Sequence, residues 1–270
     1  MDFSRPFRFG KRISINGVGR VSLPRGYRIV MLANSSNKTV EELKALKTAV
    51  ASADVRWKGR VLLLLMNFIP LIHAVSIVLA FTLPYASLPV RIGVGVCLLY
   101  LLPPLLARLV LSLCAVPEGQ IAVGTKAFFA WWASFQFQVV FCRLPALEEI
   151  LRLIPGLYSQ WLRLWGARIG RFTYWSAGTL ITDRSFLTIG DDVVFGAGVR
   201  LNAHVLDKNE NGEKVLLLAT VKIGDRVMVG GYSLLTAGTE VCADETTRAF
   251  LISPPFSVWK NGKRIRKQTE

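Results

Sequence analysis

Apolar residues recur at every sixth position in the last hundred residues, and glycine often follows them. Ile189-Gly190 is followed by Phe195-Gly196 and Leu201, and Ile223-Gly224 is followed by Val229-Gly230, Leu235 and Val241. A second apolar series lies four places later, at Val193, Val199, Val205 and Val227. Two runs in one register predict a three-sided β-coil in which each turn takes about 18 residues. An irregular β-sandwich is the alternative.

Larger spacings in the same region fit this coil. Ile169 lies 20 residues before Ile189, and Leu201 lies 22 residues before Ile223. We interpret both spacings as whole turns that carry insertions of two and four residues. After Val241 the repeat fades into the polar segment 242–248. We therefore expect a β-helix domain over 166–255, followed by a basic tail over 256–270.

A long apolar region precedes the coil. Residues 61–90 contain no Asp, Glu, Lys or Arg, and the stretches 61–82 and 92–116 are each long enough to cross about 30 Å of hydrocarbon as a helix. The second stretch contains Pro103-Pro104, which neighbouring helices can accommodate in a membrane. The pattern predicts a transmembrane helical hairpin over 61–116.

The charges that flank the hairpin indicate its orientation. The first 60 residues form a basic segment with 13 Lys and Arg against four acidic residues, whereas the connecting loop 83–91 has only Arg91. Lys and Arg near membrane segments tend to stay cytoplasmic. We expect the protein in the cytoplasmic (inner) membrane, with both termini and the coil on the cytoplasmic side. No cleavable signal peptide is apparent.

Aromatic residues crowd the uncharged stretch 127–142, which is short for a crossing. Aromatic rings favour the headgroup region, so we expect an interfacial helix here, with a buried or re-entrant helix as the alternative. The segments 147–154 and 158–165 are predicted to be further short helices. We therefore expect a region of interfacial helices over 117–165. The expected fold class is membrane α + β: a transmembrane helical hairpin with interfacial helices, followed by a left-handed parallel β-helix.

Composition narrows the function classes. The net charge of +15 accompanies no nucleic-acid recognition motif, and the hairpin flanks and the tail account for most basic residues, so we expect no nucleic-acid partner. The four cysteines show neither a disulfide framework nor paired zinc-ligand spacing, so we expect no metal. The lipid bilayer is the expected partner.

The chain has two histidines in different contexts. His73 lies in the middle of the first apolar stretch, where a structural hydrogen bond to a neighbouring helix is the favoured interpretation. His204 ends the first six-residue run and immediately precedes the polar insertion 207–214. An imidazole with an ordinary pKa near 6.5 is suited to take a proton from a hydroxyl, and such a base contributes about 10² to 10⁴ in rate.

The segment from Trp165-Gly166-Ala167-Arg168-Ile169-Gly170 through Asp183, His204 and the insertion to Gly238-Thr239 resembles the left-handed β-helix, or hexapeptide-repeat, acyltransferase family. It is similar in order and spacing to the sugar O-acetyltransferases, and also to the membrane β-helix domains of peptide-synthetase-like enzymes. The resemblance covers about residues 161–241. It implies a homotrimer that binds acyl-CoA, with acetyl-CoA as the expected co-substrate.

The resemblance also implies site residues. His204 matches the catalytic general base, and Asp183 and Asn202 match positions near the acceptor. Gly230 and Gly231 match the place where the donor's pantetheine arm approaches the backbone. Each of the last four has a structural alternative, namely a turn Asp, an asparagine ladder inside the coil, and the glycine that a tight corner requires. The family's usual closing Gly-x-Pro-Ala is replaced by Ser253-Pro254-Pro255-Phe256. The resemblance therefore does not predict how the donor end of the site binds acyl-CoA.

These observations predict a membrane-anchored acyltransferase that moves an acyl group, acetyl above all, to a hydroxyl of a lipid-linked or membrane-proximal acceptor such as a glycan precursor. N-acyl transfer uses the same base and stays open. A zinc carbonic anhydrase on such a coil needs three His ligands, and the coil has one. The remaining alternative is a non-catalytic membrane scaffold or trimerisation module, which the fading of the last coil favours.

Overall fold

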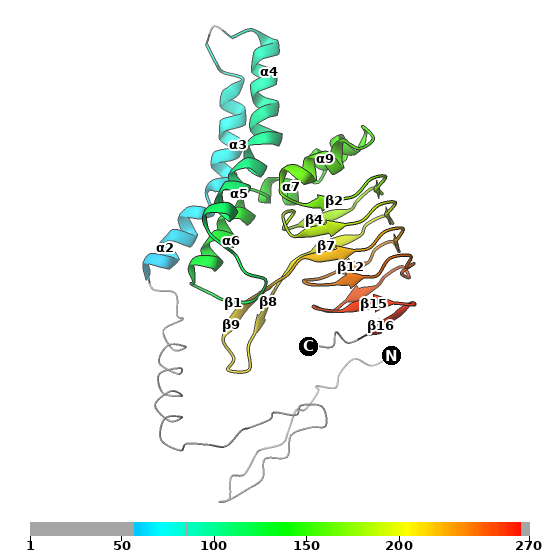
Figure 1. Ribbon diagram of the computed structural model, residues 1–270. Helices are drawn as coiled ribbons and strands as arrows, with labels where there is room; N and C mark the ends of the chain where they lie inside the picture. Colours follow the sequence, from blue (N-terminus) through cyan, green and yellow to red (C-terminus); the bar gives the residue numbers. More distant parts are fainter. Residues whose placement is uncertain (1–56, 85, 266–270) are drawn as a thin grey trace, which may run out of the picture. The chain divides into compact units, whose positions relative to one another are not determined.

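The computed structural model describes residues 57–84 and 86–265, which belong to one compact unit. Helices and a stack of short strands form separate parts of this unit (Figure 1). The expected basic segment 1–60 lies outside the described residues up to position 56, and so does the end of the tail from position 266. The structure has two long apolar helices and a set of parallel sheets. Both agree with the expected fold class in its general form, a helical part followed by a β-helix-like coil.

The first part is a pair of apolar helical arms. One arm is α2 (Trp57–Met66) and α3 (Ile69–Ala80), and the other is α4 (Leu88–Val96), the π-helix η1 (Cys97–Leu101) and α5 (Leu102–Leu113). By length and composition, Trp57–Ala80 and Leu88–Leu113 are each sufficient to cross a membrane. Only 6% and 22% of their apolar windows are buried, so the described part of the chain leaves most of this surface uncovered.

The π-helix follows from the sequence around Pro103-Pro104. The Leu102 N–H donates to the Cys97 carbonyl, which leaves the Leu98 carbonyl free to accept from His73 Nε2 at 3.0 Å. Pro104 has no N–H, and the Tyr100 carbonyl four residues earlier accepts from Trp161 Nε1 at 2.8 Å instead. The hydrogen bond expected between His73 and a neighbouring helix is therefore confirmed.

Four further helices lie between the arms and the coil: α6 (Lys126–Gln136), α7 (Val139–Arg143), α8 (Ala146–Arg152) and α9 (Leu157–Leu164). The Thr125 hydroxyl caps α6 by accepting from the Phe128 N–H at 3.3 Å. Phe128, Trp131 and Phe141 are at most 5% exposed, because they pack inside the protein. The burial favours the buried-helix alternative for 127–142.

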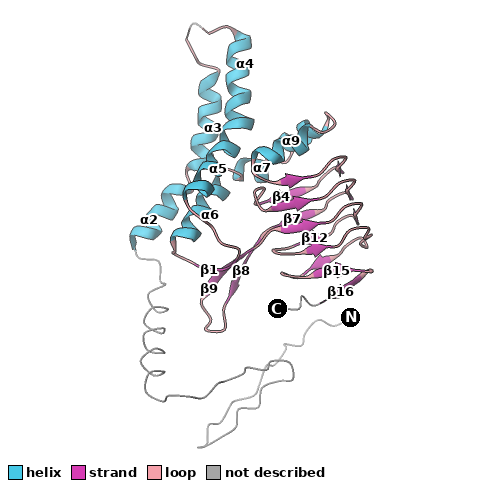
Figure 2. Ribbon diagram, viewed as in Figure 1, coloured by secondary structure: helices cyan, strands magenta, loops and turns pink. Residues whose placement is uncertain are grey.

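Three parallel sheets make the walls of the coil, and the chain visits them in turn (Figure 2). The first contains β2 (Arg168–Ile169), β5 (Leu187–Ile189), β10 (Val221–Ile223), β13 (Glu240–Val241) and β15 (Val258–Lys260), with β16 (Lys263–Ile265) antiparallel at its edge. The second contains β3 (Tyr174–Trp175), β6 (Val194–Phe195) and β11 (Met228–Val229). The third contains β4 (Leu180–Thr182), β7 (Arg200–Asn202), β12 (Leu234–Leu235) and β14 (Ile252–Ser253).

Apart from Val205, which lies in an antiparallel hairpin outside the three parallel sheets, the six-residue pattern predicts the interior of this coil correctly. Ile189 pairs with Ile169 and Ile223, and Ile223 pairs with Val241. These four side chains are at most 7% exposed. Glycine follows the interior position where successive turns touch: a methyl group added to Gly224 would lie 2.4 Å from the Ala243 nitrogen.

Of the two larger spacings, one is interpreted correctly and the other is not. Ile169 and Ile189 do lie one turn apart, but Leu201 pairs with Ile181 and Leu235, and Ile223 belongs to a different sheet. The residues between Leu201 and Ile223 therefore form one corner that carries a long insertion. The prediction of a whole turn with four extra residues in this segment is wrong.

The coil also continues where the sequence pattern fades. Leu235 of β12 pairs with Ser253 of β14, and Val241 of β13 pairs with Trp259 of β15. Polar side chains replace apolar ones in this last turn: the buried Ser253 hydroxyl accepts from Thr239 Oγ1 at 3.0 Å and from Trp259 Nε1 at 2.8 Å. The coil thus extends past residue 255, the expected end of the domain.

The polar insertion after His204 is a β-hairpin of β8 (His204–Lys208) and β9 (Lys214–Leu218). The strand β1 (Gly119–Ala122), which follows the second apolar arm, pairs antiparallel with β9. Leu216 and Leu218 of β9 are fully buried in a cluster with Phe128 and Trp131 of α6. The insertion therefore fastens the coil to the helical part.

Candidate functional site

His204 lies at the corner where the chain leaves the third sheet, at the start of β8. Asp183 occupies the same corner one turn earlier, because Thr182 and Asn202 are register partners in β4 and β7. The backbone of Asp183 is left-handed, with φ +57°, a conformation that Asp tolerates better than most residues. Stacked turns therefore bring together two side chains that are 21 residues apart in the sequence.

A chain of hydrogen bonds passes through the Asp183 carboxylate. His204 Nδ1 binds one carboxylate oxygen, and the other accepts from Trp131 Nε1 at 2.8 Å. Asp183 is 1% exposed, whereas the His204 side chain is 19% exposed. Because an ionised carboxylate only accepts hydrogen bonds, the Nδ1 atom carries the proton in the neutral ring. The lone pair of neutral His204 then belongs to Nε2.

Helix α6 supplies an aromatic wall around the imidazole. The ring centroids of Trp131 and Phe135 lie 4.9 Å and 5.3 Å from that of His204, both in edge-on arrangements. His204 Nε2 makes no hydrogen bond with any residue that the structure describes. The ring is thus held at Nδ1 and along its sides, and Nε2 has no hydrogen-bond partner in the described part of the chain.

The environment of His204 makes it a stronger base. Burial is the largest influence and would lower the pKa of the imidazole, but the charge of Asp183 and the hydrogen bond with it outweigh burial and raise the pKa. His204 therefore takes up a proton more readily than an ordinary histidine does.

The structure places the other predicted residues in different surroundings. Asn202 ends β7 beside His204, separated from it by buried Ala203, and its amide has no hydrogen bond within the described chain. Gly230 and Gly231 follow β11, at the corner that precedes the third sheet, and thus lie at the opposite end of that sheet's strands from His204. A methyl group added to Gly230 would lie 2.3 Å from the Arg248 carbonyl carbon, so the packing of turns already requires this glycine.

Two residues of the site were missed by sequence reasoning. Trp131 lies in the aromatic stretch, but nothing in the sequence indicates that its indole reaches Asp183. Arg184 directly follows Asp183 and is fully buried: its Nη1 donates to Gln138 Oε1 at 3.0 Å, and its Nη2 binds Glu148. An arginine beside a predicted site aspartate was the available signal.

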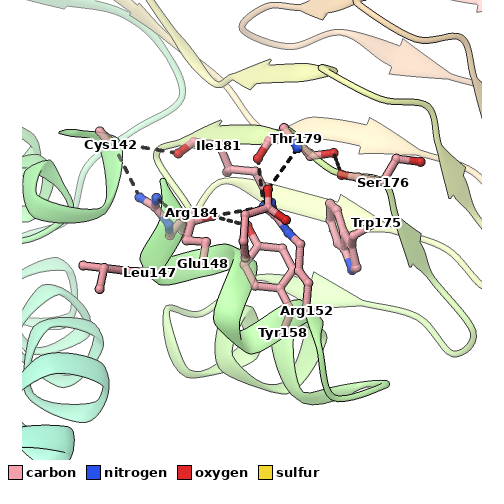
Figure 3. A network of polar contacts seen from close by, with 12 residues as sticks. Cys142, Leu147, Glu148, Arg152, Tyr158, Trp175, Ser176, Thr179, Ile181 and Arg184 are labelled. Carbon is pink, nitrogen blue, oxygen red and sulfur yellow. Dashed lines mark hydrogen bonds and ion pairs between the residues drawn. The ribbon is translucent and has the colours of Figure 1, made fainter. Parts of the chain in front are cut away.

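Figure 3 shows the network through which Arg184 fixes this corner to the helices. Glu148 of α8 also binds Arg152, at 3.2 Å, and the Tyr158 hydroxyl. Burial and then the charge of Glu148 raise the pKa of Tyr158 well above its ordinary value, so the phenol stays protonated and donates. The network holds the segment that carries Asp183 at a fixed position against α7 to α9.

The described residues contain no group of three His, Cys, Asp or Glu side chains arranged to hold a metal ion.

Comparison with known proteins gives hexapeptide-repeat acetyltransferases among the solved structures. A maltose O-acetyltransferase from Clostridium difficile 630 is 17% identical, with a TM-score of 0.34, covering 49% of this chain and 88% of that protein. A hexapeptide-repeat acetyltransferase from Vibrio cholerae O1 biovar eltor, in complex with acetyl-CoA, is 16% identical, with a TM-score of 0.34, covering 51% and 92%. A galactoside acetyltransferase in complex with coenzyme A is 14% identical, with a TM-score of 0.31, covering 48% and 82%. No protein-family model and no curated protein matches the chain.

Proposed function

We propose that the protein is an acyl-CoA-dependent O-acyltransferase, with His204 as the general base and Asp183 as the residue that orients it. The acetyl group is the proposed cargo, and a hydroxyl of a lipid-linked or membrane-proximal molecule is the proposed acceptor. The observation that carries the proposal is the pairing of His204 Nδ1 with a buried carboxylate while Nε2 is free.

The proposed reaction needs no acyl-enzyme. The acceptor oxygen attacks the thioester carbonyl carbon while its proton passes to His204 Nε2, which leaves a tetrahedral intermediate and an imidazolium. The buried Asp183 charge stabilises that imidazolium. The carbon–sulfur bond then breaks, and the thiolate of coenzyme A takes the proton from Nε2. The products are an ester and the free thiol, and His204 is neutral again.

The acceptor is proposed to be membrane-proximal because helix α6, which forms the aromatic wall around His204, is hydrogen-bonded to an apolar arm. Trp132 Nε1 and Gln136 Nε2 of α6 both donate to Asn67 Oδ1, at 3.2 Å each, and Asn67 lies between α2 and α3. The α6 helix that carries Trp131 and Phe135 is thus attached to the segment proposed to enter the membrane. Insertion of the arms, a cytoplasmic location, the left-handed sense of the coil and a homotrimer belong to the same proposal.

The scaffold alternative loses its main support. That alternative depended on a decayed last turn. In the structure, β13 and β15 continue the first sheet and β14 continues the third sheet. Thr246 forms a parallel bridge with Met228 and so continues the second sheet. A scaffold also gives no reason for an aspartate to be buried against a single histidine.

The test uses membranes that contain the full chain and acetyl-CoA labelled in the acetyl group. We expect label in the lipid extract with the wild type and a loss of about 10²-fold or more with His204→Ala. His73→Asn is the matched control, since it removes the other histidine, and we expect it to retain activity. Equal labelling by the wild type and His204→Ala would refute the role of His204.

A further inference from the structure

A cavity lies on the first turn of the coil, away from the His204 corner. It has a volume of about 680 Å³ and opens between the α8–α9 segment and β3. None of its lining residues is His204, Asp183, Asn202, Trp131 or Phe135. The proposed acyl transfer therefore makes no use of it.

The charged residues that line the cavity all carry positive charge. Arg152, Arg163 and Arg171 line the cavity, and no acidic residue does. Arg152 is paired with Glu148 and Glu149, and Arg163 donates to the Ile169 and Gly170 carbonyls. The Arg171 guanidinium, by contrast, has no partner within the described chain.

Further polar groups in the lining lack partners as well. The Thr173 hydroxyl oxygen is buried and has no hydrogen-bond partner in the described chain, and the exposed Gln160 side chain adds an amide. An anion placed in the cavity would find the Arg171 guanidinium and the Gln160 amide as donors. A planar guanidinium binds phosphate oxygens in a bidentate manner.

The rest of the cavity and its rim are apolar and exposed. Phe172 is 84% exposed, Tyr174 is 62% exposed and Ile154 is 58% exposed, and Leu153 beside them is 80% exposed. Exposed apolar residues that gather beside a charged site mark contact with an apolar ligand or a membrane. The cavity therefore combines an anion-binding part with an apolar part.

The helices that border the cavity are attached to the second apolar arm near its middle. The Tyr100 hydroxyl donates to the Leu147 carbonyl at 2.9 Å, and Trp161 of α9 donates to the Tyr100 carbonyl. Tyr100 lies 12 residues from Leu88, or about 18 Å along the helix. Arms that enter the bilayer from the Leu88 end would therefore carry α8 and α9 with them to the bilayer.

We propose that this cavity binds the headgroup of an anionic phospholipid, with Arg171 on the phosphate and the lipid chains against Ile154, Leu153 and Phe172. The site goes beyond the proposed acyl transfer, because it would hold and orient the coil at an anionic membrane surface. It selects a phosphodiester carrying net negative charge over a zwitterionic one, since the charged residues of the described chain that line the cavity are all arginines.

The test uses the purified full chain in a mild detergent, titrated with short-chain phosphatidylglycerol, short-chain phosphatidylcholine or inorganic phosphate. Bound ligand is counted by native mass spectrometry. We expect phosphatidylglycerol to bind at least about tenfold more tightly than phosphatidylcholine or phosphate, and Arg171→Glu to weaken it about tenfold or more. Arg171→Lys should retain part of the affinity.

Arg168→Glu is the matched control, because it makes the same charge change at an exposed position outside this cavity. We expect it to bind phosphatidylglycerol like the wild type. Equal weakening by Arg168→Glu and Arg171→Glu would overturn the site, and so would equal binding of both lipids. Phosphate that binds as tightly as phosphatidylglycerol would overturn the assignment to a lipid. The readout does not depend on acetyl transfer, so the two proposals can fail separately.

Discussion

At the residue scale, the site depends on the hydrogen bonds that the two oxygens of one buried carboxylate make. Asp183 binds His204 with one and Trp131 with the other, so the tryptophan fixes the orientation of the carboxylate and, through it, that of the imidazole. Trp131 is itself 1% exposed and packs against the His204 ring. It is a positioning residue under the proposed function.

Trp131→Phe should keep most of the aromatic packing and remove the hydrogen bond to Asp183. A hydrogen bond to a charged group contributes about 1.5 to 3 kcal/mol, so we expect the acetyl-transfer rate constant kcat to fall roughly tenfold or more, with KM for acetyl-CoA little changed. Trp132→Phe, which changes the neighbouring indole that binds Asn67, is the control. An unchanged kcat in Trp131→Phe would remove Trp131 from the site.

At the element scale, the corner that carries Asp183 is fixed by an ion pair buried among aromatic rings. The Arg184 guanidinium carbon lies 5.6 to 5.7 Å from the ring centroids of Phe141, Trp161 and Trp165, while its nitrogens bind Glu148 and Gln138. Removing one partner of a buried pair leaves the other charge without full compensation.

Arg184→Met should therefore destabilise the protein by about 3 to 5 kcal/mol, which corresponds to a drop in Tm of roughly 10 °C. Thermal unfolding of the full chain in detergent, followed by tryptophan fluorescence, measures it. The exposed pair of Arg226 and Asp244 supplies the control, since Arg226→Met should leave Tm nearly unchanged. Similar Tm values for the two variants would contradict the structural role of Arg184.

The apolar arms give a second prediction at this scale. Val78 of α3 is 65% exposed, and a lysine there would have to enter hydrocarbon at a cost of about 2.5 to 3.5 kcal/mol if it lay near the centre of the bilayer. We expect Val78→Lys to move much of the protein into the soluble or aggregated fraction after carbonate extraction. Met228→Lys, at an exposed apolar position of the coil, should stay in the membrane fraction. Equal retention of both variants would argue against insertion of α3.

How far the sequence predicts this fold depends on how local each signal is. The pairing of Ile189 with Ile223 follows from a six-residue period that each turn repeats, and the arms follow from an uninterrupted apolar run. The last turn was missed because Ser253 holds an interior position through hydrogen bonds, which no hydropathy pattern records. His204 was found from its place beside the insertion, whereas Trp131 was missed because its contact with Asp183 spans 52 residues.

At the scale of the whole molecule, the coil has an exposed aromatic flank that suits the proposed homotrimer. Tyr232 and Phe250 are 63% and 71% exposed and stack with ring centroids 5.4 Å apart, and Ile252 nearby is 70% exposed. Exposed apolar patches of this kind are typical of a contact surface, and the proposed homotrimer would cover this one.

Tyr232→Asp should therefore reduce the assembly toward the monomer, because it would bury a charge in the interface. Mass photometry in detergent would follow the change from a trimer of about 90 kDa of protein, three copies of 30.0 kDa, toward a single copy. Lys222→Asp, on a different sheet, is the control. A wild type that is monomeric at micromolar concentration would contradict the proposed trimer.

The central claim is that neutral His204, held by the charge of Asp183, takes the acceptor proton. Its most direct test is the pH dependence of kcat/KM for acetyl-CoA in wild type and Asp183→Asn. Because Asp183 raises the pKa of His204, the wild-type rate should rise with pH through a midpoint above about 6.5 and then level off. In Asp183→Asn burial dominates, so the midpoint should move to lower pH while the plateau falls about 10² to 10⁴-fold. Midpoints at the same pH in both proteins, or a rate independent of pH, would contradict it.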